Sequence, residues 1–149
     1  IVDYMRRQHN MLIGERTAEL IKINVGSALT DIESPPDDFP VNGRDLMTGI
    51  PKQIIVSYSE IAHAIDKSIS KIEEAILKAL ETTPPELAAD IFKTGLYLTG
   101  GGALLRGLDK RISQKTKLPV HVAEDPLRAV VRGTGIALKN MNRFTFLMD

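Results

Sequence analysis

Three consecutive glycines, Gly100, Gly101 and Gly102, lie between a short apolar run and a helix-forming run. A backbone without Cβ atoms can adopt positive φ, and a flat ligand can lie directly on it. The free N–H groups at the start of a following helix attract anions. The turn could therefore bind a nucleotide by its base, ribose or phosphates. The alternative is a tight turn that is needed only for sharp geometry or close packing.

The glycine pattern excludes two common nucleotide-binding motifs. It lacks the G-x-G-x-x-G spacing of the dinucleotide-binding fold and the G-x-x-x-x-G-K-[ST] spacing of the P-loop. A second glycine pair, Gly133 and Gly135, falls within a predicted helix, where we expect close helix packing rather than ligand binding.

No other group of residues indicates a catalytic or metal site. The histidines, His9, His63 and His121, are widely spaced and do not form a metal-binding motif. The chain has no cysteine, which excludes disulfides, thiolate catalysis and Cys-ligated zinc. We expect Glu73 and Glu74 to lie on a solvated helix face rather than to act as a catalytic pair. We therefore predict neither catalytic nor metal-binding residues.

The composition fits one ordinary domain or two small lobes, with 149 residues of which 43% are hydrophobic. Lys plus Arg equals Asp plus Glu at 19 each, so the net charge is zero. This balance argues against a nucleic-acid binder and leaves self-association unopposed by charge. No apolar run reaches the roughly 20 residues that span a bilayer, and no signal-peptide pattern is present. Because the chain starts with Ile1, we expect it to be a piece of something longer.

The first half of the sequence predicts helices around a small sheet. Helical spacing covers 2–13 and 15–22, and Gly26 ends the second segment. Short β-prone pieces at 23–30, 39–45 and 53–58 predict three antiparallel strands. We expect Ser59 to cap a long amphipathic helix that runs to Thr82, followed by a short helix over 85–91.

The second half alternates strands with helices. We expect strands at 95–99 and 119–123, a helix over 103–114, a last helix from 124 to about 141, and a tail at 142–149. Such alternation predicts a parallel or mixed sheet covered by helices. The predicted organisation is discontinuous, with a β-rich insert at 23–80 inside an α/β part formed by 1–22 and 81–149.

The segment around the glycine turn, Leu98-Thr99-Gly100-Gly101-Gly102-Ala103-Leu104-Leu105-Arg106-Gly107-Leu108-Asp109, closely resembles the adenosine motif of the actin-like ATPases, in the form found in the bacterial MreB family. Further segments agree with that family in order and spacing: LIGERTAE at 12–19, GRDL at 43–46, TPPELAADI at 83–91, LPVHVAEDP at 118–126 and RGTG at 132–135. The resemblance covers almost the whole chain.

This resemblance implies an α/β fold, the actin-like ATPase (ribonuclease H-like) fold, of which the chain would form the second, C-terminal lobe. Residues 23–80 would be subdomain IIB, a small antiparallel sheet plus helices. Residues 1–22 and 81–149 would be most of subdomain IIA.

The resemblance also implies a nucleotide site between the glycine turn and the helix before subdomain IIB. Carried over residue by residue, it is formed by Glu19, Leu20, Ile21, Lys22, Gly101, Gly102, Ala103 and Leu104, with Glu15 and Gly100 as neighbours. A carboxylate such as Glu19 can accept from ribose hydroxyls, and the stem of Lys22 can pack on a base. Spacing alone would make Glu19 and Lys22 an ordinary exposed ion pair.

The implied cofactor is ATP. In the family, Mg²⁺, the phosphates and the attacking water are held by loops of the first lobe and the first part of subdomain IIA, and nothing like them occurs in this sequence. The resemblance therefore implies that this chain does not hydrolyse ATP alone and binds nucleotide weakly. The family's membrane-binding segment also belongs to the first lobe.

The implied function is that of a cytoskeletal protein which polymerises with itself on the cytoplasmic face of the bacterial membrane and organises cell-wall synthesis. A RodZ-like membrane protein and the cell-wall elongation machinery are the other implied partners. Two alternatives stay open: a binding or scaffold module without ATPase activity, and a sugar-kinase-like or Hsp70-like member of the same superfamily.

Overall fold

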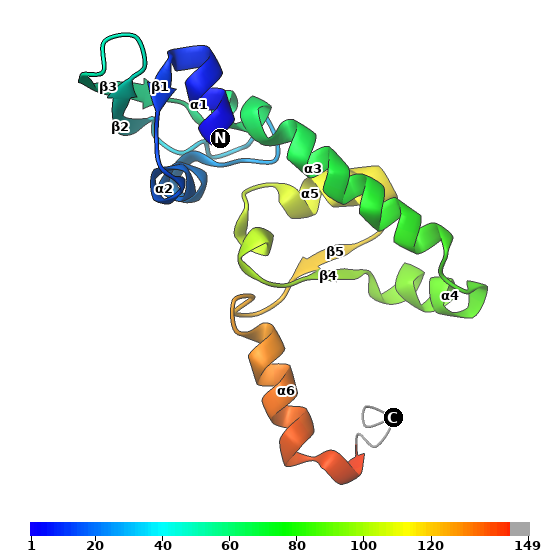
Figure 1. Cartoon of the computed structure of the whole chain (residues 1–149). Helices are drawn as coiled ribbons and strands as arrows, with labels where there is room; N and C mark the ends of the chain where they lie inside the picture. The colour runs from blue at the N-terminus through cyan, green and yellow to red at the C-terminus, as the bar shows by residue number, and fades with distance from the viewer. Residues whose placement is uncertain (144–149) are drawn as a thin grey trace.

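The computed structural model describes residues 1–143. In chain order its elements are α1 (Val2–His9), β1 (Met11–Leu12), α2 (Glu15–Val25), β2 (Phe39–Asp45), β3 (Pro51–Val56), α3 (Tyr58–Glu81), α4 (Pro85–Thr94), β4 (Leu96–Leu98), the 3-10 helix η1 (Gly101–Leu104), α5 (Leu108–Thr116), β5 (Val120–Val122), α6 (Ala129–Lys139) and the 3-10 helix η2 (Met141–Arg143). Figure 1 shows two small sheets at different places along the long helix α3, with α6 extending from the second sheet.

The first sheet is antiparallel, with strand order β1-β2-β3. Strand β2 has the predicted bounds, and it pairs with β3 through Phe39 and Val56. The predicted strand at 23–30 is wrong, because the third strand is β1, in which Met11 pairs with Asp45. Helix α1 stops before this strand because Asn10 takes a left-handed conformation with φ 48° and ψ 37°, which asparagine tolerates at a helix end.

A first hydrophobic core joins α1, α2 and the start of α3 to this sheet. Its buried residues are Met5, Met11, Ile13, Ile21, Val25, Val41, Val56 and Ile61. Residues of 1–22 thus share a core with the small sheet, while the division of the chain into subdomains stays a prediction. The change from one core to the other follows the end of α2, where Gly26 breaks the helix.

The second sheet was predicted to be parallel or mixed, and it is parallel. Strands β4 and β5 pair in parallel, with Leu96 opposite Val120, and α5 lies between them in the sequence. A second core forms here from Ala28, Ile69, Leu108 and Ile112. Helix α3 belongs to both cores, because Ile61 is buried in the first and Ile69 in the second.

Helix α3 begins two residues earlier than predicted. The cap is Ser57, whose hydroxyl accepts from the N–H of Glu60 at 3.3 Å, so Ser59 lies inside the first turn. A capping side chain satisfies one of the N–H groups that have no partner within the helix. The helix ends at Glu81, one residue before the predicted end at Thr82.

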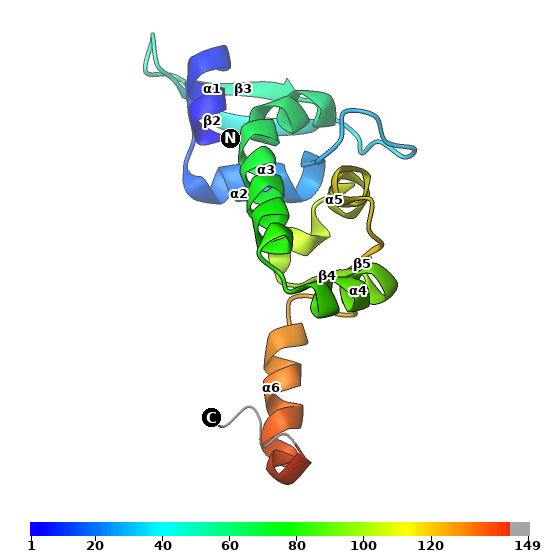
Figure 2. The same ribbon diagram turned by 90° about the vertical axis from the view of Figure 1, so that its right-hand side faces the viewer.

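Helix α6 projects away from the rest of the described chain in both views (Figures 1 and 2). None of its residues is buried, and a Cβ atom at Gly133 or Gly135 would meet nothing within 4 Å. Among residues 1–143, the close helix packing predicted at this glycine pair is therefore not found. Of the predicted tail, 142 and 143 belong to η2, and 144–149 lie outside the described residues. No helix within 1–143 is long and apolar enough to cross a membrane.

Candidate functional site

The glycine turn is a sharp bend followed by a single 3-10 turn. Gly100 has φ 79° and ψ 176°, a conformation that favours glycine, and its N–H donates to the carbonyl of Pro126 at 2.7 Å. The predicted helix over 103–114 is instead divided into η1 and α5 at Gly107, which has φ 72°. The N-terminus of α5 is therefore not at the turn, and only η1 begins there.

The backbone of the turn is open on one side. A Cβ atom at Gly100 or Gly102 would meet no atom within 4 Å, and one at Gly101 would meet Leu127 Cδ2 at 3.3 Å. Leu104 is 57% exposed, whereas Ala103 is buried. The turn thus offers bare backbone next to an exposed apolar side chain, which suits a flat ligand, while the side chain of Ala103 packs inward.

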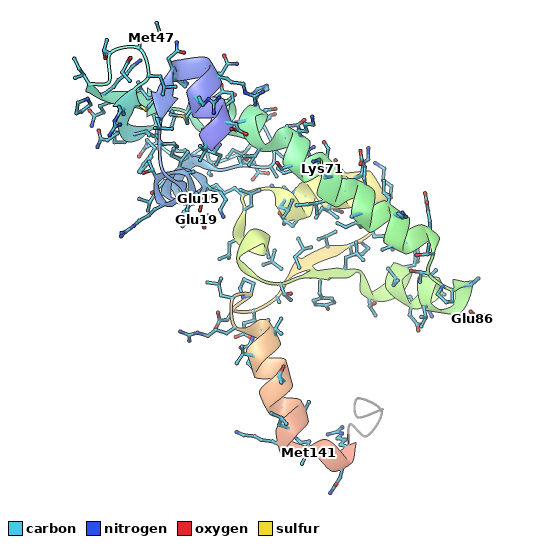
Figure 3. All side chains as sticks on the ribbon, viewed as in Figure 1. Glu15, Glu19, Met47, Lys71, Glu86 and Met141 are labelled. Atoms are coloured by element: carbon cyan, nitrogen blue, oxygen red, sulfur yellow. The ribbon has the colours of Figure 1, made fainter. Side chains whose placement is uncertain are left out.

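Helix α2 carries the polar half of the predicted site. Lys22 Nζ donates to Glu19 Oε2 at 2.6 Å, and both side chains are exposed. Glu15 and Glu19 lie close together on α2 in Figure 3 and border one shallow hollow with Lys22. The side chain of Ile21 is fully buried in the first core. Its predicted contact with a ligand could not involve that side chain, because Ile21 faces the sheet.

A joint connects the end of α2 to the chain just after the glycine turn. The guanidinium of Arg106 donates to the carbonyls of Ile23 at 3.0 Å and of Gly26 at 3.4 Å. The N–H of Ala28 donates to the carbonyl of Arg106 at 2.8 Å, and Ser27 forms a parallel bridge with Arg106. The joint thus attaches α2, with Glu19 and Lys22, to the segment that carries the glycine turn.

Sequence reasoning did not identify this joint. Arg106 and Ser27 lie far apart in the chain, and neither residue belongs to a local motif that indicates the contact. The sequence indicated only that Gly26 ends a helix at this place. The structure adds a second reason for it, since a Cβ atom there would lie 2.2 Å from the carbonyl oxygen of Lys22.

A second polar cluster fixes α5 against α3. Arg111 donates to Glu73 Oε1 at 2.7 Å, to Asp66 Oδ1 at 2.7 Å and to the carbonyl of Ala28 at 3.0 Å. The hydrogen bond that Arg111 donates to Glu73 is the main reason that the pKa of Arg111 is raised. Glu73 is only 8% exposed, so the predicted solvated face is wrong at this position. Burial of this carboxylate is tolerable because Arg111 pairs with it.

The described residues fit a nucleoside better than a cation. Open backbone at the turn, exposed Leu104 and Leu20, and the carboxylate of Glu19 are groups that can contact a base and ribose. Within residues 1–143 no group of three or more His, Asp or Glu side chains is placed to hold a metal ion.

Comparison with known proteins identifies the class to which this fold belongs. The chain superimposes on MreB5 of Spiroplasma citri bound to ADP with a TM-score of 0.90 and 38% identity, covering 95% of this chain and 42% of that one. It also matches the MamK double helical filament with a TM-score of 0.64, but at 20% identity this likeness concerns the fold alone. The structure is therefore part of an actin-like α/β fold.

The sequence comparisons are more specific. The family model described as MreB/Mbl protein matches residues 1–145. The chain is 44% identical over 143 residues to the cell shape-determining protein Mbl of Bacillus subtilis (strain 168). It is 47% identical over 139 residues to the cell shape-determining protein MreB of Escherichia coli (strain K12). The chain belongs to the MreB/Mbl family, and it spans 42% and 40% of the length of these two relatives.

Proposed function

We propose that this chain supplies the adenosine side of a nucleotide-binding cleft in an actin-like filament protein that determines cell shape. The observation that carries the proposal is the open backbone at Gly100 and Gly102, joined through Arg106 to the helix that bears Glu19 and Lys22. Support comes from Spiroplasma citri MreB5, which was solved with ADP and with AMPPNP and covers nearly all of this chain.

In this proposal the base lies on the glycine turn and the ribose faces α2. Glu19 accepts from ribose hydroxyls, and its present partner, Lys22, holds the carboxylate in place. Leu20 and Leu104 are 46% and 57% exposed, and they supply apolar surface that a base can cover. We propose ATP as the nucleotide. Mg²⁺ and the phosphates would be held by other parts of the whole protein, and we assign no chemical step to the described residues.

We further propose that the whole protein assembles with copies of itself at the cytoplasmic face of the membrane, together with a RodZ-like membrane protein and the cell-wall elongation machinery. Membership of the MreB/Mbl family supports this assembly. A zero net charge is compatible with it, because copies of the chain have no overall repulsion to overcome.

The test is a pair of glycine variants, of which one should lose ADP binding and the other should keep it. Gly102→Leu places a side chain where the base is proposed to lie, and Gly133→Leu places the same side chain in open space on α6. Neither glycine has positive φ, so both variants should fold. We expect Gly102→Leu to abolish ADP binding in an NMR titration and Gly133→Leu to leave the Kd unchanged. Equal ADP affinity in both variants would refute the proposed site.

A further inference from the structure

The joint between α2 and the glycine turn is centred on Arg106. Its guanidinium donates to the carbonyls of Ile23 and Gly26, at 3.0 and 3.4 Å. Its own carbonyl accepts from the N–H of Ala28 at 2.8 Å. Both the side chain and the backbone of Arg106 therefore hold the segment in which α2 ends.

The chemistry of this contact suits a guanidinium. The last carbonyls of a helix have no helical partner and carry partial negative charge. Nη1 of Arg106 makes both hydrogen bonds, and its two N–H groups lie in the rigid plane of the guanidinium, so the two carbonyls are satisfied from one nitrogen in a fixed geometry. Ile23 directly follows Lys22, and Arg106 lies two positions after Leu104. Arg106 thus connects the end of the predicted α2 segment, 19–22, to the end of the predicted glycine-turn segment, 100–104.

The packing around the joint leaves little freedom for movement. A Cβ atom at Gly26 would lie 3.1 Å from Leu105 Cδ1, and one at Gly107 would lie 3.0 Å from Leu29 Cδ1. Ser27 is fully buried, and its hydroxyl donates to the carbonyl of Leu29 at 2.7 Å. The chain therefore fits closely on both sides of Arg106, directly after the end of α2.

We infer that Arg106 is a positioning residue for the adenosine site, which fixes α2 relative to the glycine turn without touching the ligand. The identity of the ligand rests on the proposed function, whereas the joint itself can be tested without any ligand. An exposed arginine that merely stabilised the surface would change stability but not the placement of α2.

The first test measures that placement directly. The chain has no cysteine, so spin labels can be attached at Arg16→Cys on α2 and Lys115→Cys on α5, both exposed positions. We expect Arg106→Met to broaden the distance distribution at least about twofold. The control Ile112→Val loosens the second core, where Ile112 is 1% exposed, and should leave the distribution narrow. An unchanged distribution in Arg106→Met, or equal broadening in Ile112→Val, would overturn the inference.

The second test compares adenosine with ADP in NMR titrations. A positioning residue affects both ligands equally, so the Kd values of adenosine and ADP should rise by the same factor in Arg106→Met, about fivefold or more, as for moderate coupling between sites. A rise for ADP alone would indicate direct contact with phosphate, and no rise would indicate a surface role; either result overturns the inference. If the unmodified chain bound neither ligand, the proposed function would fail, and the spin-label distances would still decide the role of Arg106.

Discussion

Arg111 Nε lies 2.7 Å from a carboxylate oxygen of Glu73, a residue that is only 8% exposed. The pair joins α5 to the middle of α3, the helix that takes part in both hydrophobic cores. Arg111 also donates to Asp66 at 2.7 Å and to the carbonyl of Ala28 at 3.0 Å. One guanidinium therefore links α5, α3 and the segment after α2.

Loss of this guanidinium should destabilise the chain strongly. In Arg111→Met the carboxylate of Glu73 stays buried without its partner, which should lower the free energy of unfolding by about 2–3 kcal/mol. The matched control is Lys110→Met on the same helix, because Lys110 pairs with Glu33 at 3.2 Å where both side chains are exposed. It should cost less than about 0.5 kcal/mol. Urea unfolding measures both, and equal costs would contradict the role assigned to Glu73.

The cap of α3 can be tested with two nearby serines. Ser57→Ala removes the hydroxyl that accepts from the N–H of Glu60 and should lower the free energy of unfolding by about 1 kcal/mol. Ser59→Ala changes a residue inside the first turn and should be close to neutral. Thermal unfolding measures both costs. Ser59→Ala would be the more destabilised variant if the helix began at the position that the sequence predicts.

The turn between β2 and β3 should open in acid. Asp45 Oδ1 accepts from the N–H groups of Thr48 and Met47, at 3.1 and 2.8 Å. These bonds, with the one from Thr48 foremost, hold the pKa of Asp45 below its usual value of 3.8. Because the pKa of Asp45 is lower in the folded chain, the carboxylate stabilises the folded turn fully at pH values above its ordinary pKa. This stabilisation is lost as the pH falls through the lowered pKa of the folded chain.

The measurement is an NMR titration of the Met47 and Thr48 amides. Their shifts should change with a midpoint below 3.8. Asp45→Asn keeps an acceptor but does not titrate, so it should remove this change. A midpoint at or above the ordinary value would mean that the carboxylate does not hold the turn.

Adjacent residues of α2 should separate stability from binding. Ile21 is fully buried, and Leu20 is 46% exposed. Ile21→Ala should lower the free energy of unfolding by about 3 kcal/mol through the cavity that it leaves, with little change in adenosine affinity while the chain stays folded. Leu20→Ala should cost less than about 1 kcal/mol and weaken binding. Denaturant unfolding measures the stability of each variant, and NMR titration measures its affinity for adenosine. Weaker binding in Ile21→Ala than in Leu20→Ala would contradict the proposed site.

The sequence predicted those elements whose signals are local. Strand β2 was predicted at 39–45 from its β-prone composition, and the parallel pair β4 and β5 from the alternation of strands with helices. The glycine turn was predicted from three residues alone. For β2 and the glycine turn the residues that carry the signal are neighbours in the chain, and for β4 and β5 they lie within one strand–helix–strand segment.

Elements that depend on distant partners were predicted wrongly. Strand β1 exists because Met11 pairs with Asp45, and helical spacing at 2–13 does not reveal that partner. Helix α2 extends to Val25 because this side chain is completely buried in the first core. The turn-forming residues around Val25 had predicted an earlier end. Arg106 and Glu73 gained their contacts from segments far along the chain. Their roles therefore required the folded structure.

The most direct test of the central claim is the location of ADP on the chain. A ¹⁵N-labelled sample titrated with ADP should show saturable shifts confined to 19–22 and 100–104, with nuclear Overhauser contacts between the base and the amides of Gly101 and Gly102. The same titration with the Gly102→Leu variant should show none. Shifts spread evenly over the chain, or concentrated on residues away from α2 and the glycine turn, would contradict an adenosine site at this position.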